Sequence, residues 1–325
     1  MRPVVSAFVL IFLHVQLVLA GSAEVSASLT ELADSAEARA IDVYEAAKAN
    51  GIEIPSSFYG TTHNEYWWKE STCSVLGRLL NQTEYIGPLE IFWEHAEHEI
   101  TPGNLEELIY EARAFENWAS AARKFVKMPA NEWGTIWNLD CVGQFNIPEQ
   151  AAVPESKSRA TFRNEGQVLY VMGDIEPGFA EEFATEIAAN PQVSEIALGS
   201  SGGSVLDAIL AGQMIRALGL NTSLSNNCYS ACSLVFLGGV DRTIWSPYPE
   251  LGLHQIYTPT GDRIPPTDPR YLELKEYIET MGVDSKYVLA AMFSAGPTEM
   301  HISDLQSLCR SRVATWIQRQ CSADD

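Results

Sequence analysis

The second half of the chain alternates short apolar runs with longer amphipathic segments. Runs of strand length occupy 167–173, 194–200 and 221–227, and segments with helical spacing occupy 178–191 and 204–220. Strands that alternate with helices in this way are typical of βαβ units, in which helices cover a mostly parallel sheet. The pattern therefore predicts an α/β fold for this half.

The first half of the chain shows helical spacing only. Amphipathic segments cover 27–49, 66–80, 87–99 and 104–126, and Asn50-Gly51 supplies a stop after the first of them. Most of the tryptophans of the chain lie in this half, which favours a packed core over a ligand site. We expect an α-helical N-terminal domain.

The residues between the two halves carry Pro, Ser and charge without apolar periodicity, which is typical of a linker. The predicted organisation is a signal peptide at 1–23, a helical domain at 24–150, a linker at 151–166 and an α/β domain at 167–325.

The N-terminus has the layout of a secretory signal peptide. Arg2 precedes an apolar run from Val4 to Leu19, and Ala20 and Ala23 offer small residues for cleavage. The alternative is an uncleaved anchor, although the run is slightly shorter than the roughly 20 residues of a membrane span. No later segment approaches about 18 uninterrupted apolar residues. We therefore expect a soluble mature protein, periplasmic or secreted.

The charge balance excludes one class of partner. The chain has 42 Asp and Glu against 21 Lys and Arg, for a net charge of −21. A surface of this sign repels phosphate backbones, so a nucleic-acid partner is not expected. The acidity is consistent with a secreted protein that stays soluble through its charge.

Six cysteines in an exported chain favour disulfides. Local spacing favours the pairs Cys228–Cys232 and Cys309–Cys321, which leaves Cys73–Cys141 in the first half of the chain, although sequence alone does not choose among the possible pairings. A zinc site is the alternative, but paired CxxC spacing is absent. No metal and no cofactor are expected.

Ser230 is the first candidate for chemistry. It lies in "NNCYSAC" between two cysteines, after a predicted strand and at the start of a predicted helix. Serine is a good helix N-cap, so capping is one interpretation. The other is a nucleophile, which requires a neighbouring base to take its proton. Cys232 as the nucleophile is disfavoured because it lies inside the helix.

His254 and a glycine pair complete the pattern. His254 follows a short apolar strand in "ELGLHQ", and imidazole is suited to general-base work near neutral pH. Gly202-Gly203 follow the strand at 194–200 and leave backbone N–H groups unobstructed. Because the carboxyl ends of parallel strands meet at one edge of a sheet, we expect these segments and Ser230 to lie together.

These motifs, in this order, resemble the Clp protease proteolytic-subunit family within the crotonase-like superfamily. The resemblance covers 167 to about 310 and rests on Gly202-Gly203, then Ser230 among small residues, then "LGLHQ" with His254. Exported (periplasmic) proteins with the same core and a CxSAC serine motif are more similar still. The resemblance implies a ββα-repeat core with a mostly parallel sheet, preceded here by the helical domain.

The resemblance also implies a set of roles. Ser230 would be the nucleophile and His254 the general base, and the amides of Gly203 and Ala231 would form an oxyanion hole. The family places an Asp before a helix-opening Ser, and alignment on Ser303 puts Glu299 there instead.

Two further acidic residues, Asp284 and Asp304, remain alternatives to Glu299 as the third member of a triad. A Cys228–Cys232 bridge would brace the nucleophile turn. The implied function is an exported serine hydrolase, most simply a peptidase that acts on a peptide or protein substrate.

Other readings remain open. Residues 267–294 predict two inserted helices, so a homo-oligomer is possible by analogy with the ring contacts of the family. An ATP-driven unfoldase partner is not expected outside the cytoplasm. The main alternative function is a non-catalytic binding or scaffold protein that retains the fold. Crotonase-like acyl-thioester chemistry is disfavoured, because an acidic surface would repel an anionic acyl carrier.

Overall fold

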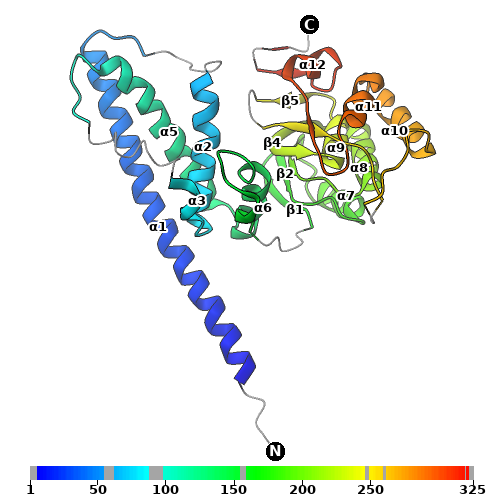
Figure 1. Cartoon of the computed structure of the whole chain (residues 1–325), viewed down its shortest axis with the longest axis horizontal. Coiled ribbons are helices and arrows are strands. Elements are labelled where there is room, and N and C mark those ends of the chain that lie inside the picture. Colours follow the sequence, from blue (N-terminus) through cyan, green and yellow to red (C-terminus); the bar gives the residue numbers. More distant parts are fainter. Residues whose placement is uncertain are drawn as a thin grey trace, which may run out of the picture. The chain divides into compact units, whose positions relative to one another are not determined.

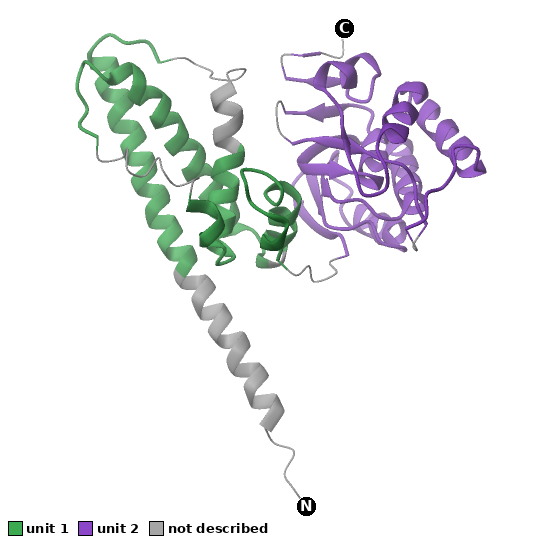
Figure 2. Ribbon diagram, in the orientation of Figure 1, with its two compact units in different colours: residues 1–154 green, residues 155–325 purple. Residues whose placement is uncertain are grey.

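The structure is a computed structural model of the chain. It describes the backbone of residues 6–54, 62–87, 98–153, 159–245, 249–258, 261–318 and 320–321. The chain forms two compact units, residues 1–154 and 155–325 (Figure 2). The predicted signal peptide at 1–23 lies outside the residues whose side chains are described. Among the described residues, no helix combines the length and apolar character needed to cross a bilayer.

The first unit is helical. Its helices are α1 (Ser6–Ala49), α2 (Thr62–Leu79), α3 (Thr83–Ile86), α5 (Leu105–Lys127) and α6 (Ala130–Asp140). Helices α1 and α5 pack side by side (Figure 1). Buried aromatic residues fill the core, and the Cys73–Cys141 disulfide ties α2 to the end of α6. Most of the predicted helix at 87–99 lies outside the described residues.

Trp118, Trp133 and Trp137, the buried tryptophans among the described residues of this unit, each have a partner for the indole N–H, as a buried polar group requires. Trp118 donates to Ser74 Oγ at 3.0 Å, and Trp137 donates to the Ala151 carbonyl at 2.9 Å. Trp133 donates to the carbonyl of Phe125, one helix earlier, at 2.8 Å. These bonds support the interpretation of the tryptophans as core residues.

The second unit is built on a mostly parallel sheet. Its strands are β1 (Thr161–Glu165), β2 (Val168–Met172), β3 (Glu195–Ser200), β4 (Asn221–Tyr229), β5 (Arg242–Ile244), β6 (Leu251–Leu253), β7 (His301–Ile302) and β8 (Trp316–Ile317). The main order is β1-β2-β3-β4-β5-β8, and β6 pairs with β4 and β7. Among the strand pairs of the described residues, β1–β2 and β6–β7 are antiparallel and the rest are parallel.

Strand β4 changes neighbours along its length. Its first residues, Thr222 and Ser223, pair with β5, whereas Cys228 and Tyr229 at its end pair with β6. All three strands run in parallel at these pairings. As a result, the carboxyl end of β4 lies beside the carboxyl end of β6, where the chain continues into His254.

In the part of this unit that the structure describes, six helices accompany the sheet. They are α7 (Phe179–Ala189), α8 (Val205–Ala217), α9 (Ala231–Leu237), α10 (Pro269–Thr280), α11 (Ser285–Ser294) and α12 (Leu305–Arg310). Every residue of α9 is buried, and this helix contacts β3, β4 and β6 (Figure 1). A fully buried short helix agrees with the apolar sequence that follows Ser230. The unit is an α/β fold with a mostly parallel sheet.

The predicted linker at 151–166 is wrong over its last residues. Thr161–Glu165 form β1, an edge strand paired with β2. The segment reads as polar because an edge strand exposes much of its surface. Its one large apolar residue, Phe162, stacks on Phe179 at 5.8 Å between ring centroids and anchors the strand to α7.

A buried arginine joins β5 to the C-terminal segment. The Arg242 side chain donates to the carbonyls of Gly239 at 2.7 Å, Arg312 at 2.7 Å and Val313 at 2.9 Å. Burial, with nearby Arg216, lowers the pKa of Arg242 to about 10, so the side chain is charged at neutral pH. The bonds to these carbonyls offset part of the cost of burying that charge.

Replacement of Arg242 by methionine is expected to lower the free energy of unfolding by more than about 2 kcal/mol, because several buried carbonyls lose their donor. Chemical denaturation of the oxidised protein measures the change. Arg270→Met is the matched control, because the fully exposed Arg270 only pairs with Asp268. Equal stability of the two variants would contradict the structural role of Arg242.

Candidate active site

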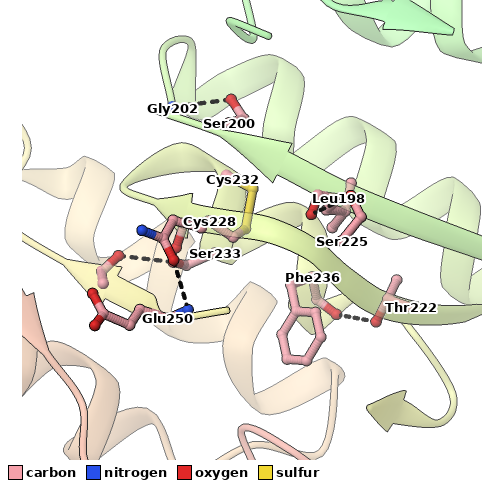
Figure 3. Close-up of a disulfide and its surroundings, with 12 residues drawn as sticks. Leu198, Ser200, Gly202, Thr222, Ser225, Cys228, Cys232, Ser233, Phe236 and Glu250 are labelled. Carbon is pink, nitrogen blue, oxygen red and sulfur yellow. Dashed lines mark hydrogen bonds between the residues drawn. A yellow bond between two sulfur atoms is a disulfide. The ribbon is translucent and has the colours of Figure 1, made fainter. Parts of the chain in front are cut away.

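The candidate site lies where β3, β4 and β6 end. After β3 the chain turns at Ser200–Ser204, and two backbone bonds hold this turn against Ile175. Ile175 N–H donates to the Gly202 carbonyl at 2.8 Å, and Ser204 N–H donates to the Ile175 carbonyl at 2.6 Å. The Gly202 N–H also donates to Ser200 Oγ at 3.0 Å (Figure 3). The glycine turn is therefore held in place at the carboxyl edge of the sheet.

Ser230 occupies the N-cap position of α9 but does not cap the helix. Its side chain makes no capping hydrogen bond, whereas Ser204, at the start of α8, accepts from Asp207 N–H at 3.3 Å. The Ser230 backbone has φ 55° and ψ −122°, a conformation that non-glycine residues rarely adopt. The capping interpretation does not describe this serine, and its half-buried hydroxyl is left without a structural bond.

The glycine turn meets the serine turn. A Cβ placed on Gly202 would lie 2.6 Å from Ser230 Cβ and 3.0 Å from the Ala231 nitrogen. Gly202 has φ +113° and Gly203 has φ +134°, so glycine suits both positions. The backbone of the "GSSGGSV" segment thus approaches the Ser230 turn more closely than any residue with a side chain would allow.

Two backbone amides at this contact are unused. Within the described residues, neither the Gly203 N–H nor the Ala231 N–H donates a hydrogen bond to the protein. The Ser230 N–H, by contrast, donates to the Gly252 carbonyl at 2.9 Å. Free amides beside a serine at a helix start are the donors that a developing oxyanion requires.

A disulfide spans the serine. Cys228, on β4, and Cys232, on α9, are bonded, with their Cα atoms 5.3 Å apart (Figure 3). Both residues are fully buried. Ser233, one residue further, donates to the Gly252 carbonyl at 2.8 Å. The strand, the turn and the helix start are therefore fastened together around Ser230. All three predicted disulfides, including Cys73–Cys141 and Cys309–Cys321, are present.

His254 lies on the same edge as Ser230. It follows β6 directly, and the Gly252 carbonyl of that strand accepts the Ser230 N–H. The imidazole is buried and faces the Tyr257 ring, with 5.4 Å between ring centroids. Burial lowers the pKa of His254 below its usual value, so the neutral form is favoured. No hydrogen bond joins this imidazole to the Ser230 hydroxyl in the structure.

The structure does not bring a predicted carboxylate to His254. Nδ1 of His254 is buried and has no hydrogen-bond partner among the described residues. Glu299 Oε2 accepts instead from Gly296 N–H at 2.9 Å. Asp284 accepts from the first amides of α11, and Asp304 accepts from Ser307 N–H in α12. All three candidates for the third triad position are therefore engaged elsewhere.

One neighbour of the site was absent from the sequence prediction. Tyr257 packs on His254, three residues along the chain, and its ring is 46% exposed. The spacing of the two residues was visible in the sequence, but no periodic pattern marks a contact within an irregular segment. Within the described residues, no group of acidic, histidine and cysteine side chains is arranged to hold a metal ion.

No protein-family model and no curated protein matches the chain. Among solved structures, a mutant of ClpP1 from Listeria monocytogenes is similar to part of it, with 15% identity and a TM-score of 0.33. The match covers 47% of this chain and 91% of the other. A likeness at this score carries no conclusion about function or mechanism.

Replacement of both Cys228 and Cys232 by alanine is expected to lower the free energy of unfolding by about 2 kcal/mol, because a short cross-link restricts the unfolded chain. The backbone at 228–233 is also expected to exchange its amide hydrogens faster, because the turn loses a constraint. Thermal unfolding and hydrogen exchange measure the two effects.

The matched control replaces Cys309 and Cys321, a bridge between residues 12 apart in sequence. That variant should lose stability without faster exchange at 228–233. Equal exchange at 228–233 in both variants would show that the Cys228–Cys232 bond does not hold the serine turn.

Proposed function

We propose that the protein is an exported serine hydrolase whose second unit cleaves an acyl bond, with peptides as the substrate class. The observation that supports the proposal most is the uncapped Ser230 hydroxyl, carried on a left-handed backbone beside two unused amides. Strained backbone at a strand-to-helix turn is a recurrent way to present a nucleophilic serine. The order of the motifs, which resembles that of the Clp proteases, favours a peptide bond.

In the proposed mechanism, Ser230 Oγ attacks the carbonyl carbon of the substrate while His254 takes the hydroxyl proton. The amides of Gly203 and Ala231 stabilise the oxyanion of the tetrahedral intermediate, each by about 3–4 kcal/mol. His254 then gives its proton to the leaving group, and an acyl-enzyme forms. A water molecule, deprotonated by the same imidazole, releases the acid and restores Ser230.

The burial of His254 Nδ1 indicates which ring nitrogen would act as the base. Because Nδ1 is buried without a partner, Nε2 is the nitrogen proposed to exchange protons with Ser230. An orienting carboxylate at Nδ1 is worth on the order of 10⁴ in rate in a complete triad. Glu299 would reach this position only by releasing Gly296 N–H. We therefore propose a Ser–His pair, with Glu299 as a third member only after rearrangement.

The proposed location is the periplasm or the cell exterior, reached through the N-terminal apolar segment. Three disulfides are consistent with an extracellular or periplasmic protein. The Cys228–Cys232 bond adds a specific reason, because it braces the turn that carries the proposed nucleophile. No ATP-driven partner is proposed.

One observation favours a second function. His254 Nδ1 meets no carboxylate among the described residues, as expected of a protein that has kept the fold of a hydrolase but not its catalytic activity. The alternative is a binding or scaffold protein, in which the same edge holds a peptide and the serine is inert. The two functions differ in whether Ser230 forms a covalent adduct.

A fluorophosphonate probe is expected to label the oxidised protein at Ser230, because the phosphonyl oxygen occupies the proposed oxyanion hole. Ser230→Ala should abolish labelling, and His254→Ala should lower its rate by about 10²-fold or more, the usual contribution of a general base. Mass spectrometry of the labelled peptide measures both.

Ser294→Ala and His301→Ala are matched controls, because Ser294 Oγ lies 2.8 Å from His301 Nδ1 and neither residue is part of the proposed machinery. Ser294 Oγ also donates to the Ala291 carbonyl, so its proton is already committed. These variants should label as the wild type does. Absence of label on folded, oxidised wild-type protein would favour the binding function.

The pH dependence of kcat/KM is expected to show an acidic limb below pH 6.5. The pKa of His254 is lowered from 6.5 by burial, and only the neutral imidazole acts as a base. Activity should therefore persist as the pH falls through 6.5 and decline only below it. A limb above 6.5 would indicate a carboxylate at Nδ1 in solution, and Glu299→Gln would then lower that limb.

A further inference from the structure

A hairpin follows His254 directly and brings two side chains together. Its backbone bonds run from Thr258 N–H to the Asp262 carbonyl at 2.9 Å and from Ile264 N–H to the Ile256 carbonyl at 3.0 Å. Tyr257 and Arg263 face each other between these bonds as an antiparallel pair. Residues of such a non-hydrogen-bonded pair project from the same face and approach closely. The Arg263 side chain therefore leaves the hairpin beside the Tyr257 ring.

The Tyr257 ring links this pair to the candidate site. Its centroid lies 5.4 Å from that of the His254 ring, and the planes are tilted by 33°. The tyrosine is 46% exposed, although the imidazole beneath it is buried. One side of the phenol thus covers the histidine, and the rest is open to a ligand.

Arg263 extends back toward the strand end that carries His254. Its Nη2 lies 2.6 Å from the position that a Cβ on Gly296 would occupy, and Glu299 Oε2 lies 3.3 Å from the same position. The residue before Gly296 is Ala295, whose carbonyl accepts the N–H of Gln255, the neighbour of His254. The guanidinium therefore lies beside the Ala295–Gly296 segment, which bonds to the neighbour of His254.

The Arg263 guanidinium forms no ion pair and donates no hydrogen bond among the described residues. The Glu299 carboxylate lies on the same side of Gly296, but Glu299 Oε2 accepts from Gly296 N–H. Arg270 differs, because it pairs with Asp268. Carboxylates outnumber cations in this chain, which has a net charge of −21, and yet this arginine beside the candidate site forms no ion pair with a described residue.

We infer that Tyr257 and Arg263 form a subsite that binds a carboxylate of the substrate beside His254, an inference that rests on the proposed function. A guanidinium offers a planar fork that matches a carboxylate, and the phenol offers an apolar wall for the carbons that carry it. For a peptide, the carboxylate belongs to an Asp or Glu side chain or to a free C-terminus. The subsite makes the enzyme selective for acidic or C-terminal peptide segments.

Binding is tested first without catalysis, in protein carrying Ser230→Ala. Saturation-transfer NMR compares three probes: N-acetylglutamate amide, N-acetylglutamine amide and N-acetylalanine with a free carboxylate. We expect transfer to a carboxylate probe to exceed transfer to the glutamine probe by about tenfold, the difference that a charge-assisted hydrogen bond makes. The preferred carboxylate probe identifies the source, a side chain or a C-terminus. Adding Arg263→Gln should remove the difference.

Arg270→Gln is the matched control, because it removes a surface arginine that already has a carboxylate partner. Transfer in that variant should keep its preference for the carboxylate probe. Equal transfer to all three probes, or a preference that survives Arg263→Gln, would overturn the inference. The result stands apart from the proposed function, because the Ser230→Ala protein cannot form an acyl-enzyme.

Selectivity in catalysis is tested with a library of N-acetylated peptides analysed by mass spectrometry. Wild-type protein should prefer peptides with a carboxylate at one fixed distance from the cleaved bond by about tenfold or more. Arg263→Lys should keep part of that preference, and Arg263→Glu should reverse it toward Lys and Arg. An identical cleavage profile for wild type and Arg263→Glu would refute the subsite while leaving the hydrolase proposal intact.

Discussion

The carboxyl edge of the sheet depends on the left-handed backbone of Ser230. Three contacts hold that conformation: the Ser230 N–H bond to Gly252, the Cys228–Cys232 disulfide and the close approach of Gly202. A strained residue persists only where its surroundings over-determine it, and these contacts come from three separate segments. The strained serine therefore depends on both the pairing of β4 with β6 and the position of the glycine turn.

The sequence predicted the parts of the fold that rest on apolar periodicity. The segments that became β2, β3, α7 and α8 are buried runs or amphipathic helices, so their residues carry the signal directly. Strand β1 was not predicted, because an edge strand with a single aromatic anchor, Phe162, has the polar sequence of a linker. Two cysteine pairs were predictable because their members lie 4 and 12 residues apart, and Cys73–Cys141 was the pair that remained.

The sequence predicted only those features of the site that follow from the path of the backbone. Ser230, His254 and the glycine turn share an edge because parallel strands end there, which the order of elements implies. Whether a carboxylate meets His254 was not predictable, because an Asp before a helix serves equally well as a cap. Asp284 and Asp304 both cap helices, and Glu299 binds a backbone amide. Hydrogen bonds from backbone amides to these carboxylates produce no periodic pattern in the sequence.

The C-terminal segment has a consequence for how the second unit assembles. The Arg242 guanidinium donates to the carbonyls of residues 312 and 313. Strand β8 pairs with β5 and forms the edge of the sheet. Without residues 312–317, β5 would form an exposed edge of the sheet and the buried Arg242 side chain would lack two of its acceptors. Docking of this segment therefore completes the sheet and the buried core of the second unit in one step.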